Sequence, residues 1–340
     1  EVFYTDKILQ RLGIPVKSPF AAANIDPDFD LCVYSTAYTA EKNEEMLSIQ
    51  QSGKPMLAYP EALGQLTEHR LTLAVCGTHG KTTTSALLAE ALRAAHVKPS
   101  AIVGSEIETW QGGALAGEGP YLVIEADEYQ DKLRSYTPYG VVLTSVDWDH
   151  PDFFPTPAAY EAVFERFLAR IPRHGFLVAC GDDARVRQVA EEAKCQKWFY
   201  GFLEGNDVRI VQWEVVDPES EAGQRGVRQR FQVDYHGQIV GPFSLRLSGK
   251  HNALNAAAVL SVFFQLKLPL EALSQSLSLF RGTKRRFELL GSKGQALVFD
   301  DYAHHPEEIK VTLTAFRELY PKRRLTVVFH PHTYTRTKAL

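Results

Sequence analysis

The sequence predicts an α/β protein of several domains built on parallel sheets. Short apolar runs at residues 121–125 and 141–145 are typical of strands buried on both faces of a parallel sheet. Segments with helical spacing follow such runs, as at residues 157–171, which begin with a proline suited to a first helical turn. A chain of 340 residues exceeds the usual size of one core, so we expect two or three domains.

We expect residues 1–66 to form the first α/β unit. Helical spacing at Ile8, Leu9 and Leu12 comes first, followed by a strand at 30–34, a helix at 41–51 and a strand at 55–58. A nucleotide-binding unit of this type would begin with a strand and a Gly-rich turn. Neither precedes the first helix, so we expect this unit to lack its N-terminal part.

Residues 67–283 predict the central unit. Its strands are expected at 71–76, 121–125, 141–145 and 175–179, with Asp182 or Asp183 capping a helix that runs to residue 193. Residues 208–247 alternate in polarity and turn at His236–Gly237, which predicts a smaller antiparallel part. A helix at 252–264 closes the unit.

Residues 284–340 predict a third, Rossmann-like unit. A strand at 296–299, a helix at 306–319 and a second strand at 325–329 are all that it contains. We therefore expect the unit to be truncated at its C-terminal end.

Composition excludes several classes of protein. The net charge of -4 and pI near 6.3 give no general attraction to nucleic acid. No apolar run approaches the roughly 20 residues that a membrane span requires. The four cysteines form no metal-ligand spacing, so we expect a reduced, cytoplasmic protein without structural zinc.

The segment between the strand at 71–76 and the following helix is a candidate phosphate loop. It lacks the first glycine of the common pattern G-x-x-x-x-G-K-[ST], because Val75 occupies that position. Backbone N–H groups at a helix N-terminus favour anions, while Lys81 can neutralise phosphate charge and Thr82 can hold Mg²⁺. A Gly-rich turn without ligand is the alternative. The residues expected at ATP are Gly77, Thr78, His79, Gly80, Lys81, Thr82 and Thr83.

Acidic side chains follow the strand at 121–125. Glu125, Asp127 and Glu128 at a strand end cost solvation unless they meet cations, and Mg²⁺ held between carboxylates and phosphate would supply them. A solvated acidic loop is the alternative. His150 follows the next predicted strand and could bind metal or orient a neighbour.

Two further clusters follow strands of the third unit. One is the segment 300–306, which contains Asp301, Tyr302, His304 and His305, and the other is the segment 330–336. The adjacent histidines should point in different directions, which favours binding of ribose, phosphate or a substrate carboxylate over a metal site. Arg285 and Arg286 are either solvated or positioned to reach phosphate.

These segments together resemble the Mur ligase family, the ATP-dependent ligases of peptidoglycan precursor synthesis. The resemblance covers nearly the whole chain. It rests on segments 77–83, 125–128, 149–150, 251–255, 285–287, 300–306 and 331–337 in this order. It implies three domains, here 1–66 for the UDP-sugar, 67–283 for ATP and 284–340 for a Rossmann-like domain, with the outer two incomplete.

The resemblance also implies roles for individual residues. Lys81, Glu125, His150 and Arg286 would be catalytic. Thr82, Glu125 and His150 would hold two Mg²⁺ ions, with Mn²⁺ as an alternative. Asn252 and Asn255 would contact adenine, Arg286 phosphate and Asp301 ribose. The residues expected near the incoming amino acid are Tyr302, His304, His332 and Arg336.

The implied reaction joins L-alanine to UDP-N-acetylmuramate in a cytoplasmic monomer or homodimer, with no nucleic acid or membrane insertion. Tyr129 departs from the serine common after the acidic motif, and Thr333 replaces a common arginine. Two alternatives remain open. One is ligation of a whole tripeptide to UDP-N-acetylmuramate during peptidoglycan recycling, and the other is a non-catalytic ATP-binding regulatory module.

Overall fold

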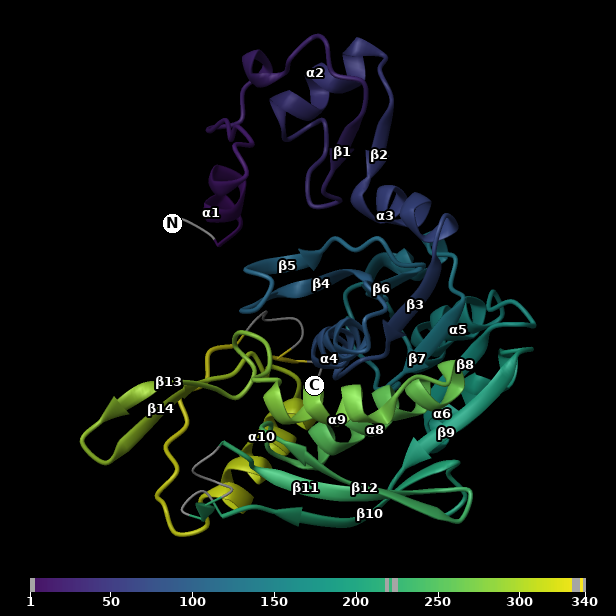
Figure 1. Ribbon diagram of the computed structural model, residues 1–340. Helices are drawn as coiled ribbons and strands as arrows, with labels where there is room; N and C mark the ends of the chain where they lie inside the picture. Colours follow the sequence, from purple (N-terminus) through teal and green to yellow (C-terminus); the bar gives the residue numbers. More distant parts are fainter. Residues whose placement is uncertain (1–3, 218–219, 222–225, 332–336, 339–340) are drawn as a thin grey trace. The chain divides into compact units, whose positions relative to one another are not determined.

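A computed structural model describes residues 4–217, 220–221, 226–331 and 337–338 (Figure 1). They divide into two units, one formed by residues 1–70 and 135–137 and the other by residues 71–134 and 138–340. The three-domain boundaries at residues 66 and 283 stay a prediction. No helix in the described ranges is long and apolar enough to cross a membrane.

The first unit is a small α/β assembly. Its two short strands lie in the two apolar runs that predicted them, and they pair in parallel with Val33 opposite Leu57. Asn43 caps the second helix by accepting a hydrogen bond from the Met46 amide at 3.0 Å. The elements are α1 (Tyr4–Arg11), the 3₁₀ helix η1 (Ala22–Asn24), β1 (Cys32–Tyr34), α2 (Glu44–Ser52), β2 (Met56–Ala58) and α3 (Tyr59–Glu68).

The second unit is built on one ten-stranded sheet with the order β12-β11-β10-β9-β8-β7-β3-β6-β4-β5. Six adjacent strand pairs, from β10–β9 through β6–β4, are parallel. The strands are β3 (Leu71–Cys76), β4 (Ser100–Ile107), β5 (Gly112–Leu115), β6 (Tyr121–Glu125), β7 (Gly140–Leu143), β8 (Phe176–Cys180), β9 (Gln196–Gly201), β10 (Val208–Val215), β11 (Gln229–Tyr235) and β12 (Gln238–Leu245).

The predicted antiparallel part exists, but it continues the main sheet. β11 and β12 form a hairpin around His236 and Gly237, both with positive φ, as the sequence predicted. β10 pairs antiparallel with β11 and parallel with β9, which joins the hairpin to the parallel strands.

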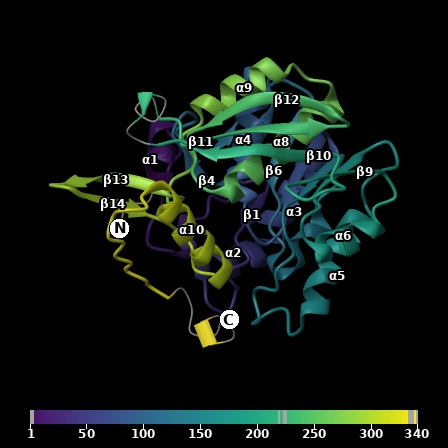
Figure 2. The ribbon, with the colours of Figure 1, turned by 90° about the horizontal axis from the view of Figure 1, so that it is seen from below.

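Helices cover this sheet in two groups. α4 (Lys81–Ala94), α8 (Lys250–Leu266) and α9 (Leu270–Leu279) pack on one another and against the strands. α5 (Pro157–Leu168) and α6 (Ala184–Val189) form a separate layer (Figure 2). Short 3₁₀ helices η2 (Tyr129–Ser135) and η3 (Ala190–Glu192) complete the connections. Asp183 caps α6 by accepting from the Arg185 amide at 2.8 Å, which confirms one of the two predicted caps.

The last segment differs from the expectation in its strands. β14 (Ala296–Asp300) pairs antiparallel with β13 (Glu288–Lys293), and α10 (Pro306–Leu319) follows. The predicted strand at 325–329 is wrong for the described chain, because this segment pairs with no strand there and Val328 is 95% exposed. An apolar run becomes a strand only where a neighbouring edge accepts its hydrogen bonds.

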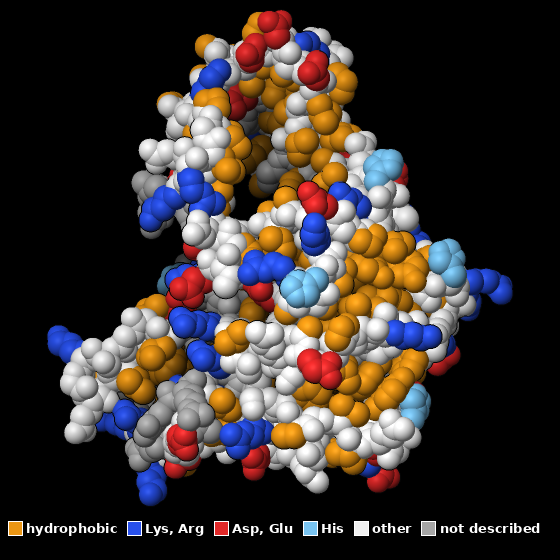
Figure 3. All heavy atoms as spheres, in the orientation of Figure 1, with side chains coloured by type: hydrophobic (Ala, Val, Ile, Leu, Met, Phe, Trp, Pro, Cys, Tyr) orange, Lys and Arg blue, Asp and Glu red, His pale blue; other side chains and the backbone are white. Residues whose placement is uncertain are grey.

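Acidic and basic side chains are interspersed on the face of the molecule in Figure 3. This matches the near balance of 37 Lys and Arg against 41 Asp and Glu. The surface on this face has no large field of a single sign.

Candidate active site

The candidate phosphate loop connects β3 to α4, and two glycines set its path. Gly77 and Gly80 have φ of +125° and +79°, a region that side chains disfavour. A Cβ atom on Gly77 would lie 2.7 Å from the Ser145 carbonyl oxygen, and one on Gly80 would lie 2.7 Å from Oδ1 of Asn255. The loop is therefore pressed between the end of β7 and the start of α8.

The Lys81 side chain folds back over this loop. Its Nζ donates to the carbonyl oxygens of Gly77 at 2.6 Å and Thr78 at 3.1 Å, and it pairs with Glu128 Oε2 at 2.9 Å. Burial alone would lower the pKa of Lys81, but the carboxylates of Glu128 and Asp127 outweigh it and hold that pKa above its ordinary value. The loop therefore carries a fixed positive charge at neutral pH.

Glu128 is 1% exposed and is held by a second donor. The Tyr160 hydroxyl donates to Glu128 Oε1 at 2.9 Å and lies 2.9 Å from the Thr78 hydroxyl. Burial, and then the charge of Glu128, raise the pKa of Tyr160 well above its ordinary value. This chain of contacts ties the acidic motif after β6 to helix α5 and to the loop.

Thr82 and Glu125 meet as the sequence predicted. The Thr82 hydroxyl donates to Glu125 Oε1 at 2.7 Å, and the Gly104 amide donates to Glu125 Oε2 at 2.7 Å. Hydroxyl and carboxylate oxygens are the protein ligands that Mg²⁺ prefers, so the donor set fits that ion. Within the described ranges, no three His, Cys, Asp or Glu side chains converge on a metal site.

His150 lies after β7 with a left-handed backbone, φ +55°. Its ring stacks on Tyr129 at 4.4 Å between centroids, and its Nε2 lies 3.8 Å from Asp149 Oδ2. These contacts are separate from the Thr82–Glu125 pair, with which His150 was predicted to act.

His79 connects the phosphate loop to the last segment of the chain. Its Nδ1 lies 3.2 Å from Glu308 Oε1, and its ring centroid lies 4.8 Å from that of His305. On the other side, Nε2 lies 3.5 Å from Asp147 Oδ2. The predicted ATP-binding histidine is thus placed between two carboxylates.

Glu308 is a residue of this site that the sequence alone did not reveal. Its carboxylate meets His79, Nη1 of Arg286 at 3.5 Å and the backbone amide of His304 at 3.3 Å. Burial opposes its charge, but the hydrogen bond with His79 and the charge of Arg286 hold the pKa of Glu308 well below its usual range. Because Glu308 is the third residue after the cap His305, the sequence signals only a first-turn acidic residue of α10.

A cavity of about 460 Å³ gathers many of the predicted residues. It also includes Arg185 and His251, which the sequence analysis did not select. The predicted residues in its wall are His79, Gly80, Thr82, Thr83, Asn252, Asn255, Arg286 and Asp301.

The first turn of α8 lines one side of this cavity. Asn252 Nδ2 donates to the Ser248 carbonyl oxygen at 2.7 Å and lies 2.9 Å from His251 Nε2. Asn255 Nδ2 donates to Asn252 Oδ1 at 3.2 Å. Burial first, and then Arg286, lower the pKa of His251 to about 4, so a neutral ring faces the cavity.

The predicted amino-acid contacts are placed only in part. Tyr302 is 37% exposed and lies under the guanidinium groups of Arg285 at 4.6 Å and Arg286 at 5.8 Å. His304 Nδ1 lies 2.9 Å from the Tyr302 carbonyl oxygen, whereas His305 faces His79, so the adjacent histidines do point apart. His332 and Arg336 lie outside the described residues.

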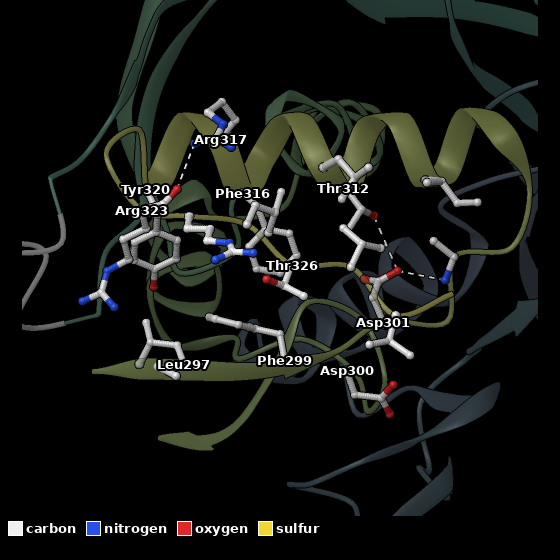
Figure 4. Close-up of a pocket in the computed structure, with 18 of the residues that line it drawn as sticks. Leu297, Phe299, Asp300, Asp301, Thr312, Phe316, Arg317, Tyr320, Arg323 and Thr326 are labelled. Carbon is white, nitrogen blue, oxygen red and sulfur yellow. Dashed lines mark hydrogen bonds between the residues drawn. The ribbon is translucent and has the colours of Figure 1, made fainter. Parts of the chain in front are cut away.

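Asp301 stands at the border of a second cavity, of about 850 Å³, between β14, α10 and residues 322–329 (Figure 4). Its carboxylate accepts from the amides of Phe287 at 2.7 Å and Ala303 at 2.8 Å, so it shapes the local backbone. Figure 4 shows Phe299 and Phe316 in the wall of this second cavity, where their rings meet edge to face at 4.8 Å between centroids, with Asp301 and Thr312 at one end. Asp301 and Thr312 line both cavities.

Sequence comparison defines the class of protein. Residues 2–71 match the Mur ligase family, catalytic domain; residues 75–263 match the Mur ligase middle domain; residues 285–339 match the Mur ligase, glutamate ligase domain. The chain belongs to the Mur ligase family, whose members are ATP-dependent ligases.

Within that family, the chain is similar to UDP-N-acetylmuramate–L-alanine ligases. It is 37% identical to the enzyme of Desulfitobacterium hafniense, over 100% of this chain and 73% of that one. It is 38% identical to the enzyme of Oleidesulfovibrio alaskensis, over 98% of this chain and 70% of that one.

Solved structures agree on the fold. The UDP-N-acetylmuramate–alanine ligase of Thermotoga maritima matches with a TM-score of 0.83 at 24% identity, covering 100% of this chain and 75% of that chain. A UDP-N-acetylmuramate:L-alanyl-γ-D-glutamyl-meso-diaminopimelate ligase of Neisseria meningitides matches with a TM-score of 0.70 at 26% identity, covering 82% and 87%. The α/β fold expected from the sequence is confirmed.

Proposed function

We propose that this chain is an ATP-dependent ligase that joins L-alanine to the carboxylate of UDP-N-acetylmuramate in peptidoglycan precursor synthesis. The observation that carries the proposal is the 460 Å³ cavity, in which the phosphate loop, the first turn of α8 and Arg286 share one space. The choice of substrates rests on the relatives, which carry that activity in their names at 37% and 38% identity.

The first step transfers the γ-phosphoryl group of ATP to the sugar carboxylate, which gives an acyl phosphate and ADP. This step brings two anions together. At about 4 Å and an effective dielectric of 20, each pair of unit charges repels by roughly 4 kcal/mol. Uncompensated, that repulsion would slow the reaction nearly a thousandfold at ~1.4 kcal/mol per tenfold.

Positively charged groups of this chain would offset that repulsion between anions. Lys81 lies in the loop with its charge secured by Glu128, and Arg286 lies in the cavity wall beside Glu308. Thr82 and Glu125 would hold Mg²⁺, which when bound neutralises phosphate oxygens. His150 would bind a second ion, and Asn252, Asn255 and Asp301 would receive the nucleoside.

In the second step the amine of L-alanine attacks the acyl carbonyl carbon, inorganic phosphate leaves with the electron pair of the broken C–O bond, and the nitrogen gives up one proton to solvent. Tyr302, His304, His332 and Arg336 are the residues that we propose around the incoming amino acid. Cytoplasmic location and a monomeric or homodimeric state remain predictions.

Release of ADP tests the proposal. The protein carrying this sequence should release ADP when it receives ATP, Mg²⁺, UDP-N-acetylmuramate and L-alanine, and should form the UDP-N-acetylmuramoyl-L-alanine product seen by mass spectrometry. Replacing L-alanine with L-Ala-γ-D-Glu-meso-diaminopimelate should stop turnover. Turnover with the tripeptide alone would assign the recycling reaction, and ATP binding without either turnover would assign a regulatory module.

The variant Lys81→Ala tests the assignment of the phosphate loop. It should abolish product formation and leave a cooperative thermal unfolding transition. A folded Lys81→Ala protein with full ATP-dependent activity would refute the site assignment.

A further inference from the structure

The side chain of Tyr129 links the carboxyl ends of two strands across the phosphate loop. β6 and β7 flank β3 in the sheet, so residues that follow them lie on either side of the loop that follows β3. Tyr129 comes shortly after β6, and His150 comes after β7. Their rings stack at 4.4 Å between centroids with 28° between planes.

Tyr129 is fixed at several points. Its hydroxyl donates to Asp152 Oδ2 at 2.8 Å, its ring meets the edge of Phe153 at 5.9 Å, and Lys132 Nζ lies 5.4 Å from its centroid. A ring held by Phe153, by Lys132 and through its hydroxyl presents a flat surface of fixed orientation to His150.

The backbone of His150 is also fixed, by contacts separate from those of its ring. The His150 amide donates to Asp149 Oδ1 at 2.6 Å, and its carbonyl oxygen accepts from the amides of Phe153 at 2.9 Å and Phe154 at 2.8 Å. With φ at +55°, the residue holds a conformation that needs such support. The flat face of Tyr129 supports the plane of the imidazole ring, whose Nε2 also lies 3.8 Å from Asp149 Oδ2.

We infer that Tyr129 is a positioning residue that holds the His150 ring in the orientation needed to bind a divalent cation beside the phosphates. The inference rests on the proposed function, in which His150 is a metal ligand. Metal-binding histidines depend on neighbours that fix the ring, and here a stacked aromatic face would do so. A purely structural role for Tyr129 would instead change the stability of the fold and leave metal binding unchanged.

Electron paramagnetic resonance can measure the binding of Mn²⁺ to the protein saturated with a non-hydrolysable ATP analogue. This measurement distinguishes a positioning role of Tyr129 from a purely structural one. Tyr129→Ser should weaken Mn²⁺ binding about three- to tenfold, the range expected from one aromatic pair. Tyr129→Phe keeps the ring face and should stay within about twofold of the parent. In steady-state assays, Tyr129→Ser should raise the Mn²⁺ concentration for half-maximal rate and keep kcat at saturating Mn²⁺.

Three more variants make the result decisive. Tyr129→Leu fills the volume without a flat face, so it should match Tyr129→Ser and replaces it if the serine variant does not fold. Tyr139→Leu removes a tyrosine at the opposite end of β7, where it packs edge-on against Phe176 at 5.8 Å, and should leave Mn²⁺ binding unchanged. His150→Ala measures the loss that follows removal of the ring.

The outcomes are distinguishable. Weak binding in His150→Ala together with parental binding in both Tyr129→Ser and Tyr129→Leu overturns the inference and leaves the proposed function in place. Parental binding in His150→Ala overturns the inference together with the metal role of His150. Absence of nucleotide-dependent Mn²⁺ binding in the parent protein overturns the proposed function itself.

Discussion

Protonation of His251 should make this protein sensitive to mild acid. An amide nitrogen only donates, so the 2.9 Å contact between Asn252 Nδ2 and His251 Nε2 requires that ring nitrogen to be the unprotonated acceptor. Nδ1 is buried and has no hydrogen-bond partner among the described residues. Burial and the nearby Arg286 disfavour a charged ring, whereas Glu308 favours it, and the net effect lowers the pKa to about 4.

The sign and size of the effect follow from linkage. In the unfolded chain the ring takes up a proton near its ordinary pKa of 6.5, whereas in the folded protein it does so only near 4. Between these values the unfolded state binds more protons, so the free energy of unfolding falls as the pH falls. At ~1.36 kcal/mol per unit, the 2.5-unit window amounts to roughly 3 kcal/mol lost between pH 6.5 and 4.

Urea unfolding at several pH values between 7 and 4 measures this loss, with His251→Gln as the comparison. The glutamine side chain is neutral throughout, so the variant should lose less stability per pH unit than the parent, by up to ~1.4 kcal/mol per unit. A lower stability of the variant at pH 7 is irrelevant, because the test compares slopes.

A direct titration completes the test. The imidazole NMR signal absent from the His251→Gln protein should titrate in the parent with a midpoint near 4. Equal pH slopes in the two proteins, or a midpoint near the ordinary value, would refute the reasoning.

Other substitutions test the buried charges and the loop. Glu128→Gln breaks the buried pair with Lys81 and should lower the free energy of unfolding by about 3 kcal/mol; an unchanged urea midpoint would contradict this. Gly77→Ala combines strain at positive φ with overlap, and should cost at least about 2 kcal/mol and abolish ATP binding in calorimetry. Glu308→Gln should cost about 1.5–3 kcal/mol, whereas Glu307→Gln, on the exposed side of the same turn, should change stability by less than ~0.5 kcal/mol; equal losses would argue against the contacts described for Glu308.

The sequence predicted those features that depend on neighbours along the chain. The loop from Gly77 to Thr83 follows its strand and opens its helix as expected, because glycine conformation and the helix N-terminus are local properties. The contact of Thr82 with Glu125 was also predictable, since parallel strands bring their carboxyl ends to one edge.

Features that depend on distant partners escaped prediction. Nothing local shows that His79 meets Glu308, 229 positions later, or that Asn255 lies against Gly80. The apolar run at 325–329 shows a need for burial but does not identify a strand partner. The roles proposed for His332 and Arg336 concern residues outside the described part, so they rest on the resemblance alone.

The join between the parallel and antiparallel strands gives the sheet a mechanical weak point. β9 and β10 pair through only Val208 with Tyr200 and Arg209 with Gly201. If the hairpin strands separated there, β9 would become an open edge able to pair with another chain. α8 packs on β8, β9 and β10, so it covers the β9–β10 pairing from one side. The first turn of the same helix lines the 460 Å³ cavity. We therefore expect separation of β9 from β10 to disturb that cavity, and a ligand that stabilises α8 to oppose the separation.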